Sequence, residues 1–461
     1  MKPLRRWQSE CIVQALAHFQ NGRHFFVQAT PAAGKTRLAA EIAKCLLEKG
    51  LIDFVICFAP TREVVAGIQR TFTDVLQKRF GDTIGAVGAA YTYQSMAYQS
   101  NDFWDIFNKF RILLIFDEIH HCAGHDPLLS NSWGQKILQY LQDQATYTVG
   151  LSGTPWRSDS LPVALARYSD PDERLVCDYC YDLRTAIRDG VCRAPRVTLI
   201  DNSMIQLVEE QENSSSVRLF SGVAQLLGES PVSYEDLLRH DDILNAVLDI
   251  GIHKLGKVRR VVPDAGGLVV AADIEHAHQI SEILHAKGES FVVVTSKTPR
   301  AHDVIEQYRH SDICWIVAVS MISEGTDIPR LCTCLYLSRI RTELHYRQVL
   351  GRILRKIGIE DDMAWLYVIA EPVLRKFSRR IADDLPDDQA TLQTKKLAEH
   401  LEKARTDHGA ALISNSGGAE VEEASAIEHK KYPEKSKLLV NSDFLTLSFS
   451  NYYRQYLLSL I

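Results

Sequence analysis

Short apolar runs that alternate with amphipathic stretches constrain the fold of this chain more than any other feature. Each run has four or five residues, as a buried strand does, and the stretches between them have helical spacing. Continuous apolar strands separated by helices are typical of a parallel sheet covered on both faces. The pattern occurs twice, so it predicts an α/β protein with two parallel-sheet domains in tandem. The predicted strands are His24–Val27, Phe54–Phe58, Ile112–Phe116 and Tyr147–Leu151, then Gly267–Ala271, Phe291–Val294, Trp315–Val319, Thr333–Leu337 and Trp365–Ile369.

The alternation stops between the two sets of strands and again after the second set. The polar run Glu209–Ser216 is typical of a loop, so residues 201–240 are expected to form a connector or insertion. Beyond residue 370 the chain turns helical and charged, and its apolar end, Phe444–Ile461, is expected to dock on the body or on a partner. The predicted parts are domain 1 (1–200), the connector (201–240), domain 2 (241–370) and a helical C-terminal extension (371–461) with a polar linker near 415–437.

The composition is typical of a soluble globular protein. Of the 461 residues, 46% are hydrophobic and 24% charged, enough for two or three domains with sizeable cores. The sequence has no run of 18 apolar residues and no apolar stretch at its N-terminus, so we expect no membrane span, no secretory signal and a cytoplasmic location. The net charge of −6 does not point to a nucleic-acid partner, although a basic cleft is compatible with an acidic chain.

The segment Ala29–Thr36 lies between a predicted strand and a helical run that starts near Arg37, which is the setting of a phosphate-binding loop. Backbone N–H groups of such a loop, and of the helix after it, bind phosphate oxygens. Lys35 is expected to reach the β- and γ-phosphates of ATP, and the Thr36 hydroxyl to help hold Mg²⁺. Ala29 departs from the usual pattern, which has a glycine there. The loop residues expected to contact ATP are Thr30, Pro31, Ala32, Ala33, Gly34, Lys35 and Thr36.

Two adjacent carboxylates, Asp117 and Glu118, follow the predicted strand Ile112–Phe116. A strand-end aspartate can hold Mg²⁺, and a neighbouring glutamate can orient and deprotonate an attacking water. Two carboxylates exposed at a turn are the alternative interpretation. The histidines that follow, His120 and His121, are expected to couple this site to a neighbouring loop. A zinc site formed with Cys122 and His125 is a weaker alternative, because the spacing is irregular.

Other features have two interpretations each. Cys177 and Cys180, with Cys192 nearby, hint at zinc, but a second pair at suitable spacing is missing from the sequence. Cys332 and Cys334 alternate within a strand and are expected in the core. A basic group either contacts phosphates or forms a solvated helix face; it consists of Lys254, Lys257, Arg259 and Arg260. An aromatic group either stacks on bases or lies on a docked helix; it consists of Tyr452, Tyr453 and Tyr456.

Together these blocks resemble the superfamily-two helicases and translocases, closest to the DEAH-like group. Asp117-Glu118-Ile119-His120 matches the box that names the group. Leu4–Gln8 looks like the adenine-recognition element, with Gln8 reading the base and Arg5 near it. Leu151–Pro155 resembles motif III, in which Ser152 and Thr154 link hydrolysis to strand binding and Gly153 replaces the commoner alanine. Two further elements resemble those that contact the nucleic-acid backbone, through Pro60, Thr61 and Arg62 and through Thr92, Tyr93 and Gln94.

The resemblance continues in the second domain and covers about residues 1–370. Ser323–Pro329 looks like motif V and Gln348–Arg355 like motif VI. It implies ATP contacts from Gly325, Asp327 and Gln348, and strand contacts from Thr295, Ser320 and Ser323. Arg352 and Arg355 are three residues apart, so on a helix they would share a face and could stabilise charge on the transferred phosphoryl group. Ala186–Val191 is also similar to the segment that ends the first domain in restriction- and phage-type members, whereas the tail from residue 371 matches nothing.

The resemblance implies two RecA-like domains that hydrolyse ATP to ADP and phosphate in an inter-domain cleft, with Mg²⁺, and couple this to movement along nucleic acid. DNA is favoured over RNA because the likeness leans to the restriction and repair branch, and a setting in antiviral defence fits that branch. The main alternative is an ATP-gated DNA clamp that recruits a nuclease or other effector, through the C-terminal extension, without unwinding. A nucleotide hydrolase with no nucleic-acid role is a third reading, disfavoured by the match over motifs IV to VI.

Overall fold

The computed structural model describes residues 3–122, 133, 137, 141, 144–154, 162–169, 175–211, 214–319, 327–358, 361–383, 437–440, 443–449 and 453–457. Contacts divide the chain into two compact units. The first contains Met1–Cys192, Ile322–Asp327 and Thr342–Arg352. The second contains Arg193–Met321, Ile328–Arg341 and Ile353–Ile461.

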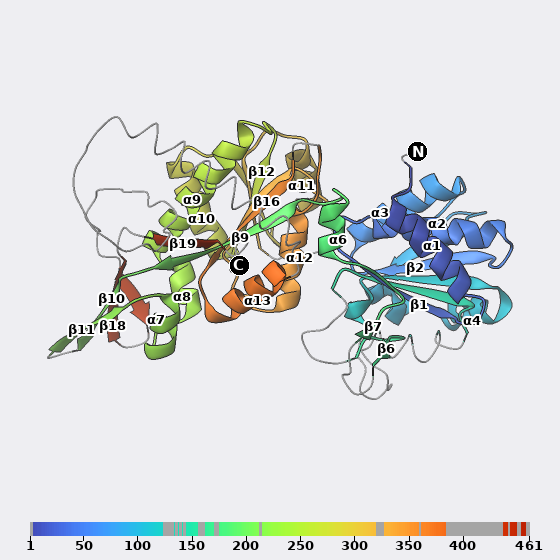
Figure 1. Cartoon of the computed structure of the whole chain (residues 1–461), viewed down its shortest axis with the longest axis horizontal. Helices are drawn as coiled ribbons and strands as arrows, with labels where there is room; N and C mark the ends of the chain where they lie inside the picture. Colours follow the sequence, from blue (N-terminus) through green and yellow to red (C-terminus); the bar gives the residue numbers. More distant parts are fainter. Residues whose placement is uncertain are drawn as a thin grey trace. The chain divides into compact units, whose positions relative to one another are not determined.

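The first unit is built on a six-stranded sheet in the order β3-β2-β4-β5-β1-β8, in which every neighbouring pair is parallel (Figure 1). All four strands predicted for this part are confirmed, and β3 and β8 are additional. The central strands are almost fully buried because apolar residues line both of their faces. The strands are β1 (His24–Ala29), β2 (Phe54–Ala59), β3 (Gly88–Thr92), β4 (Ile112–Asp117), β5 (Tyr147–Ser152) and β8 (Tyr179–Tyr181). A separate two-stranded sheet pairs β6 (Arg167–Tyr168) with β7 (Leu175–Val176).

The helices of the first unit begin where the sequence supplies caps. Thr61 accepts a hydrogen bond from the backbone N–H of Val64, and Ser100 and Asp182 cap later helices in the same way. The helices are α1 (Arg6–His18), α2 (Lys35–Glu48), α3 (Arg62–Leu76), η1 (Tyr93–Tyr98), α4 (Asn101–Lys109), η2 (Ile119–His121) and α6 (Leu183–Arg188).

The second unit is built on a seven-stranded sheet in the order β13-β14-β12-β15-β16-β9-β19. All five strands predicted for this part are confirmed. Six strands are parallel, and β19 pairs antiparallel with β9 at the edge. The strands are β9 (Ala194–Asn202), β12 (Gly266–Val270), β13 (Phe291–Val294), β14 (Trp315–Ala318), β15 (Leu331–Tyr336), β16 (Met363–Ile369) and β19 (Tyr453–Leu457). Strand β9 pairs along its length with β16, so its residues belong to the second sheet.

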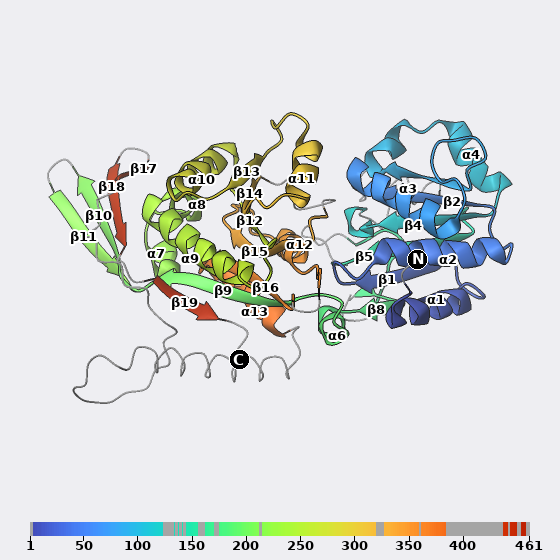
Figure 2. The same cartoon turned by 90° about the horizontal axis from the view of Figure 1, so that it is seen from above.

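Residues 201–240 contribute strands and helices to the second unit. Most of the stretch predicted as a polar loop lies in the two strands of a hairpin, β10 (Ile205–Gln211) and β11 (Ser214–Phe220), so that prediction is wrong. Figure 2 shows these strands beside β18 and β17 in a small sheet of their own, ordered β11-β10-β18-β17. The helices of this unit are α7 (Val223–Glu229), α8 (Tyr234–Arg239), α9 (Asp241–Arg259), α10 (Ile274–Ala286), α11 (Ala301–Arg309) and α13 (Pro372–Asp383). Helix α12 (Glu343–Ile353) belongs to the first unit up to Arg352.

The C-terminal extension begins with helix α13, as predicted, and also supplies strands. These are β17 (Lys437–Val440), β18 (Asp443–Phe449) and β19. Tyr453 and Tyr456 therefore lie in a strand, and the docked-helix interpretation is wrong for them. The predicted linker, near 415–437, lies outside the described residues except for Lys437, which starts β17.

Two tandem α/β units with parallel sheets confirm the predicted fold class, two RecA-like domains with a C-terminal extension. Among the described residues, no helix combines the length and apolar character needed to cross a membrane.

Candidate nucleotide-binding site

Three loops meet at one edge of the first sheet because their strands are parallel neighbours. Strands β4, β5 and β1 lie side by side, so the segments that follow them leave from the same carboxyl-terminal edge. That edge is where ligands bind in open α/β sheets. The loop after β1 is the predicted phosphate loop, the one after β4 carries the paired carboxylates, and the one after β5 carries Ser152, Gly153 and Thr154.

The loop after β1 has the backbone shape of an anion-binding turn. Gly34 adopts φ 92° and ψ 40°, in the left-handed region, and helix α2 starts at the next residue. Ala32 also has a positive φ, of 67°, which is uncommon for a residue with a Cβ. Such alternation turns successive N–H groups toward one side of the loop, as in phosphate-binding nests. The missing first glycine, at Ala29, therefore does not prevent the loop from forming.

Helix α1 holds this loop from outside through the two residues predicted to lie near the adenine. Arg5 Nη1 donates to the carbonyl oxygens of Ala32 and Ala33, at 3.1 and 2.6 Å. The Gln8 side-chain amide donates to the Gly34 carbonyl at 3.0 Å and accepts from the Arg5 backbone N–H at 3.0 Å. Arg5 and Gln8 thus fix the carbonyls of Ala32, Ala33 and Gly34 in the loop.

Lys35 connects the loop after β1 to the carboxylates after β4. Its Nζ lies 3.1 Å from Glu118 Oε1 and donates to the Ala29 carbonyl at 3.2 Å. Glu118 also accepts the backbone N–H of Gly153 at 3.2 Å on Oε2, and it has a positive φ of 53°. The ammonium and the carboxylate are therefore already in place at the strand edge.

Asp117 fits a divalent cation. It ends β4, its side chain is buried, and its Oδ1 has no hydrogen-bond partner among the described residues. Burial raises the pKa of Asp117, and the neighbouring charge of Glu118 raises it further. A buried carboxylate oxygen without a hydrogen-bond partner among the described residues suits Mg²⁺, which takes oxygen ligands.

The charge on Glu118 is stabilised by its neighbours. Burial alone would raise the pKa of Glu118, but the charges of Lys35 and His120 outweigh it and lower the pKa. Glu118 is therefore ionised at neutral pH, as a general base must be.

The residues predicted to couple hydrolysis to strand binding form one network. His120 Nδ1 lies 2.9 Å from Ser152 Oγ and 3.4 Å from Glu118 Oε2. Ser152 Oγ accepts the Thr154 backbone N–H at 3.1 Å. The ring of His121 lies 4.6 Å from that of His120, centroid to centroid. A shift of the segment after β5 would therefore change the hydrogen bonds of Glu118.

Neither predicted zinc alternative gains support from the structure. No group of three His, Cys, Asp or Glu side chains suited to a metal is found where the chain is described, and His125 lies outside that part. The thiol of Cys177 donates to Gln28 Oε1 at 3.7 Å, and Cys192 is buried.

The predicted strand-contacting residues of the first unit divide by exposure. Arg62 and Gln94 are exposed, Thr61 and Thr92 are half-buried, and Pro60 and Tyr93 are buried. Tyr93 is 0% exposed and its hydroxyl donates to the Asp117 carbonyl at 2.8 Å. Its side chain therefore supports the carboxylate strand from inside, and prediction of a strand contact from this side chain is wrong.

In the second unit, Thr295 follows β13, is buried, and accepts the Lys297 backbone N–H at 3.2 Å. Asp327 and Gln348 are described, whereas Gly325, Ser320 and Ser323 lie outside the described residues. Arg352 lies in the last turn of α12, which ends at Ile353, so Arg355 follows the helix. The expectation that both arginines share a helical face is therefore wrong, although both lie in the predicted motif.

Of the ambiguous basic residues, two have structural roles. Arg259 donates to the carbonyls of Ala265 and Asp312, at 2.8 and 3.0 Å. Lys254 Nζ lies 3.6 Å from the centre of the Trp365 ring, a cation–π contact.

Sequence reasoning missed two residues of the site. Tyr93 was assigned by its motif position, and no local pattern marks its inward orientation. A Cβ on Gly153 would lie 3.1 Å from Lys35 Nζ and 3.3 Å from Pro31 Cδ, so the glycine gives the lysine room. The only signal for this was the departure from the alanine usual at that position.

Residues 1–157 match the family model described as "Type III restriction enzyme, res subunit". An uncharacterised protein of Mycobacterium tuberculosis is 30% identical over 374 residues, 77% of this chain and 59% of that protein. A protein described as DNA 3'-5' translocase XPB2, from Sulfurisphaera tokodaii, is 25% identical over 381 residues, 77% of this chain and 79% of that protein. The chain spans about 60% of the length of the mycobacterial relatives.

Among solved structures, an ATP-dependent type ISP restriction-modification enzyme bound to DNA shares the fold, with a TM-score of 0.54 at 14% identity. The likeness covers 80% of this chain and 28% of that one. The phosphate loop, the paired carboxylates and the segment after β5 lie together in the part that the family model matches. Over residues 1–157 the chain is therefore similar to the type III restriction res subunit family, and its fold is that of the solved restriction enzyme.

Proposed function

We propose that this protein hydrolyses ATP and uses the energy to move along DNA. The observation that supports this most strongly is the arrangement of Lys35, Asp117 and Glu118 at the edge of the first sheet. It combines an ammonium for phosphate, a bare carboxylate oxygen for a cation and an ionised carboxylate for water.

In this proposal, the loop N–H groups and Lys35 bind the β- and γ-phosphates. Lys35 would then exchange part of its contact with Glu118 for phosphate oxygens, which frees Glu118 to accept a proton. Water attacks the γ-phosphorus, the bond from that phosphorus to the β–γ bridging oxygen breaks, and Glu118 takes the proton of the water. ADP and phosphate leave. Mg²⁺, held by Thr36 and Asp117, would neutralise phosphate charge when bound.

Arg352 and Arg355 are proposed to stabilise the transferring phosphoryl group, with Gly325, Asp327 and Gln348 as further nucleotide contacts. These roles rest on the resemblance of their segments to motifs V and VI. Gln8 is proposed to read the adenine, because it already contacts the phosphate loop at Gly34.

The preference for DNA is proposed from the comparisons, since one relative is described as a DNA translocase and one solved neighbour is bound to DNA. The proposed strand contacts in the first unit are Arg62, Gln94, Thr61, Thr92, Pro60 and Ser323, and those in the second unit are Thr295 and Ser320. Contacts of this kind go mainly to the backbone, so binding would be weakly sequence-dependent and sensitive to salt.

The deciding experiment measures ATP turnover with no polymer, single-stranded DNA, duplex DNA and RNA, beside strand displacement on a fork substrate. DNA should stimulate turnover more than RNA does. Stimulation without displacement would favour a translocase, or the alternative clamp that recruits an effector through residues 371–461. An absence of stimulation by every polymer would contradict the motor function.

A further inference from the structure

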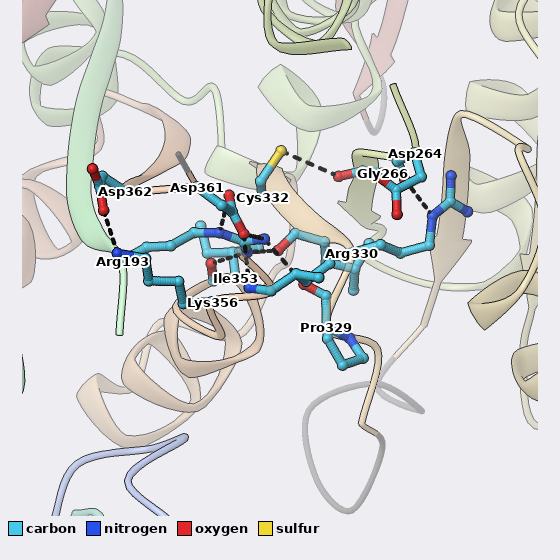
Figure 3. A network of polar contacts seen from close by, with 12 residues as sticks. Arg193, Asp264, Gly266, Pro329, Arg330, Cys332, Ile353, Lys356, Asp361 and Asp362 are labelled. Carbon is cyan, nitrogen blue, oxygen red and sulfur yellow. Dashed lines mark hydrogen bonds and ion pairs between the residues drawn. The ribbon is translucent and has the colours of Figure 1, made fainter. Parts of the chain in front are cut away.

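A buried arginine at the start of the second unit has no role in the site described above. Arg193 precedes β9, and its side chain is 1% exposed. Figure 3 shows its guanidinium facing Asp361, whose side chain is 7% exposed. Arg193 Nε donates to Asp361 Oδ1 at 2.7 Å, and Nη2 donates to Oδ2 at 2.5 Å. The pair is therefore bidentate and shielded from water.

The remaining N–H groups of Arg193 bind backbone carbonyls. Nη1 donates to Leu331 and, at 2.8 Å, to Ile353, and Nη2 donates to Pro329 at 3.0 Å. A guanidinium has five N–H donors in a fixed fork, and five acceptors surround this one. The planar fork can hold several carbonyls in one geometry, which a lysine cannot do.

The bound carbonyls belong to the two segments predicted to respond to the nucleotide. Pro329 ends the segment that resembles motif V, two residues after Asp327. Ile353 follows Arg352 at the end of α12. The backbone N–H of Arg193 also donates to the Leu354 carbonyl at 2.8 Å. One side chain thus fixes the ends of both segments relative to each other within the second unit.

A second buried arginine, Arg330, directly precedes strand β15, which starts at Leu331. Arg330 Nε donates to the Asp264 carbonyl at 2.7 Å (Figure 3). Its Nη1 donates to the Tyr308 carbonyl at 3.0 Å. Among the described residues, the hydrogen bonds and the cation–π contact of Arg330 reach Asp264 and Tyr308, and neither of these residues lies in α12. Arg193 therefore connects the described ends of the two predicted motifs, and Arg330 anchors one of them.

Arg193 also lies where the chain passes from one unit to the other, since the first unit's main segment ends at Cys192. The next residue, Ala194, starts β9 and donates to the Asp362 carbonyl at 2.8 Å. A displacement of the chain at this junction would reach the segments of Asp327 and Arg352 through the Arg193 hydrogen bonds.

We propose that Arg193 is a positioning residue for ATP turnover: it holds the segments of Asp327 and Arg352 in the register that turnover requires. The proposal rests on the proposed ATPase function. It makes no claim that Arg193 touches the nucleotide. Loss of the fork should therefore lower kcat more than it weakens ATP binding, because the hydrogen bonds of Arg193 among the described residues reach no residue of the phosphate loop.

The test uses Arg193→Lys and the double variant Arg193→Met with Asp361→Leu, in the full chain. The lysine keeps the charge beside Asp361 but loses the fork. The double variant removes both charges, so it leaves no buried ion unpaired, and such replacements are often tolerated. The matched control is Arg239→Met, which breaks an arginine–carboxylate pair with Asp273 in the same unit, away from both segments.

DNA-stimulated kcat and KM, the Kd of a fluorescent ATP analogue and the thermal unfolding midpoint are measured for each protein. In the double variant kcat should fall about 10-fold or more while Kd changes by less than about 3-fold. The kcat of Arg193→Lys should lie between those of the double variant and the wild type. Arg239→Met should keep the wild-type kcat per folded molecule.

A wild-type kcat in the folded double variant would overturn the positioning role and leave Arg193 as a structural residue only. A fall in kcat that matches the loss of folded, analogue-binding protein would overturn it too. If the wild type itself shows no ATP turnover with any polymer, the proposed function has failed, and this outcome is distinct from both of the others.

Discussion

Glu118 is oriented by three neighbours from different loops before any ligand binds. Lys35 contacts one carboxylate oxygen, and the Gly153 N–H and His120 lie at the other. Hydrogen bonds to an ionised group are stronger than those between neutral groups. The geometry of the base thus depends on the close approach of the segment after β5, and Gly153 is the residue that permits it.

Gly153→Ala tests that dependence. The added Cβ would lie 3.1 Å from Lys35 Nζ, so the lysine must shift by a few tenths of an ångström. We expect kcat/KM for ATP to fall about 3- to 10-fold. Gly228→Ala in α7 is the control, because its Cβ meets nothing within 4 Å, and its activity should be unchanged. Equal activity of both variants would show that the close approach is unimportant.

Arg62 is the exposed cation among the predicted strand contacts of the first unit. In Arg62→Ala, affinity for single-stranded DNA should fall, and the slope of log K against log salt should become shallower by about 0.7, the value for one phosphate contact. Arg70→Ala, on the same helix, should leave the slope unchanged. Salt titration of DNA binding measures both, and identical slopes for Arg62→Ala and the wild type would exclude the contact.

Among the helices, α10 has in its first turn a buried histidine that is neutral at ordinary pH. His276 is fully buried and accepts the Ala272 backbone N–H at 3.1 Å through Nδ1. Burial and, to a smaller extent, the charge of the nearby Arg239 lower its pKa to about 4. The contribution to stability is complete above the ordinary pKa of 6.5 and is lost as the pH falls through the folded-state value of about 4.

The second unit should therefore lose about 2 kcal/mol of unfolding free energy from this group between pH 7.5 and pH 5. His276→Gln keeps an acceptor for Ala272 and does not titrate, so the variant should lose less over the same range. Urea unfolding at the two pH values measures the difference. An equal loss in the variant and the wild type would mean that His276 is not the titrating group.

Strands with a strong apolar run could be predicted from the sequence, and strands that depend on distant partners could not. Ile112–Phe116 is fully buried, and its run is unmistakable. Strand β9 (Ala194–Asn202) has polar residues in its run, and it forms because β16 offers a parallel partner. The sequence leaves base stacking and a docked helix open for Tyr453 and Tyr456, yet Tyr453–Leu457 pairs as a strand with the antiparallel edge that β9 provides. Pairing partners of this kind are set by the tertiary structure.

Much of the site could be predicted because its residues follow strands at one edge. Lys35, Asp117, Glu118 and Ser152 were placed together by motif order and parallel topology alone. Side-chain orientation was not predictable: Tyr93 faces inward because its hydroxyl has a buried carbonyl to bind. Arg193 left no motif, since its partners are backbone carbonyls far away in sequence.

In the whole molecule, the residues of the proposed ATPase are distributed over two units that are each built on a mainly parallel sheet. The first unit carries the phosphate loop and both carboxylates, and the second carries the buried Arg193 network that ties the ends of two predicted motifs. The net charge of −6 argues that DNA would be held by local cations and not by the overall field. Binding at moderate salt should therefore depend on few side chains.

The proposed ATPase function is tested most directly by ATP turnover in Glu118→Gln with saturating ATP and single-stranded DNA. We expect kcat to fall about 100-fold or more, because the proposed general base is lost. ATP binding should persist or tighten, since Lys35 no longer pairs with a charged carboxylate. Turnover of Glu118→Gln at the wild-type rate, with ATP bound in the loop, would contradict the central claim.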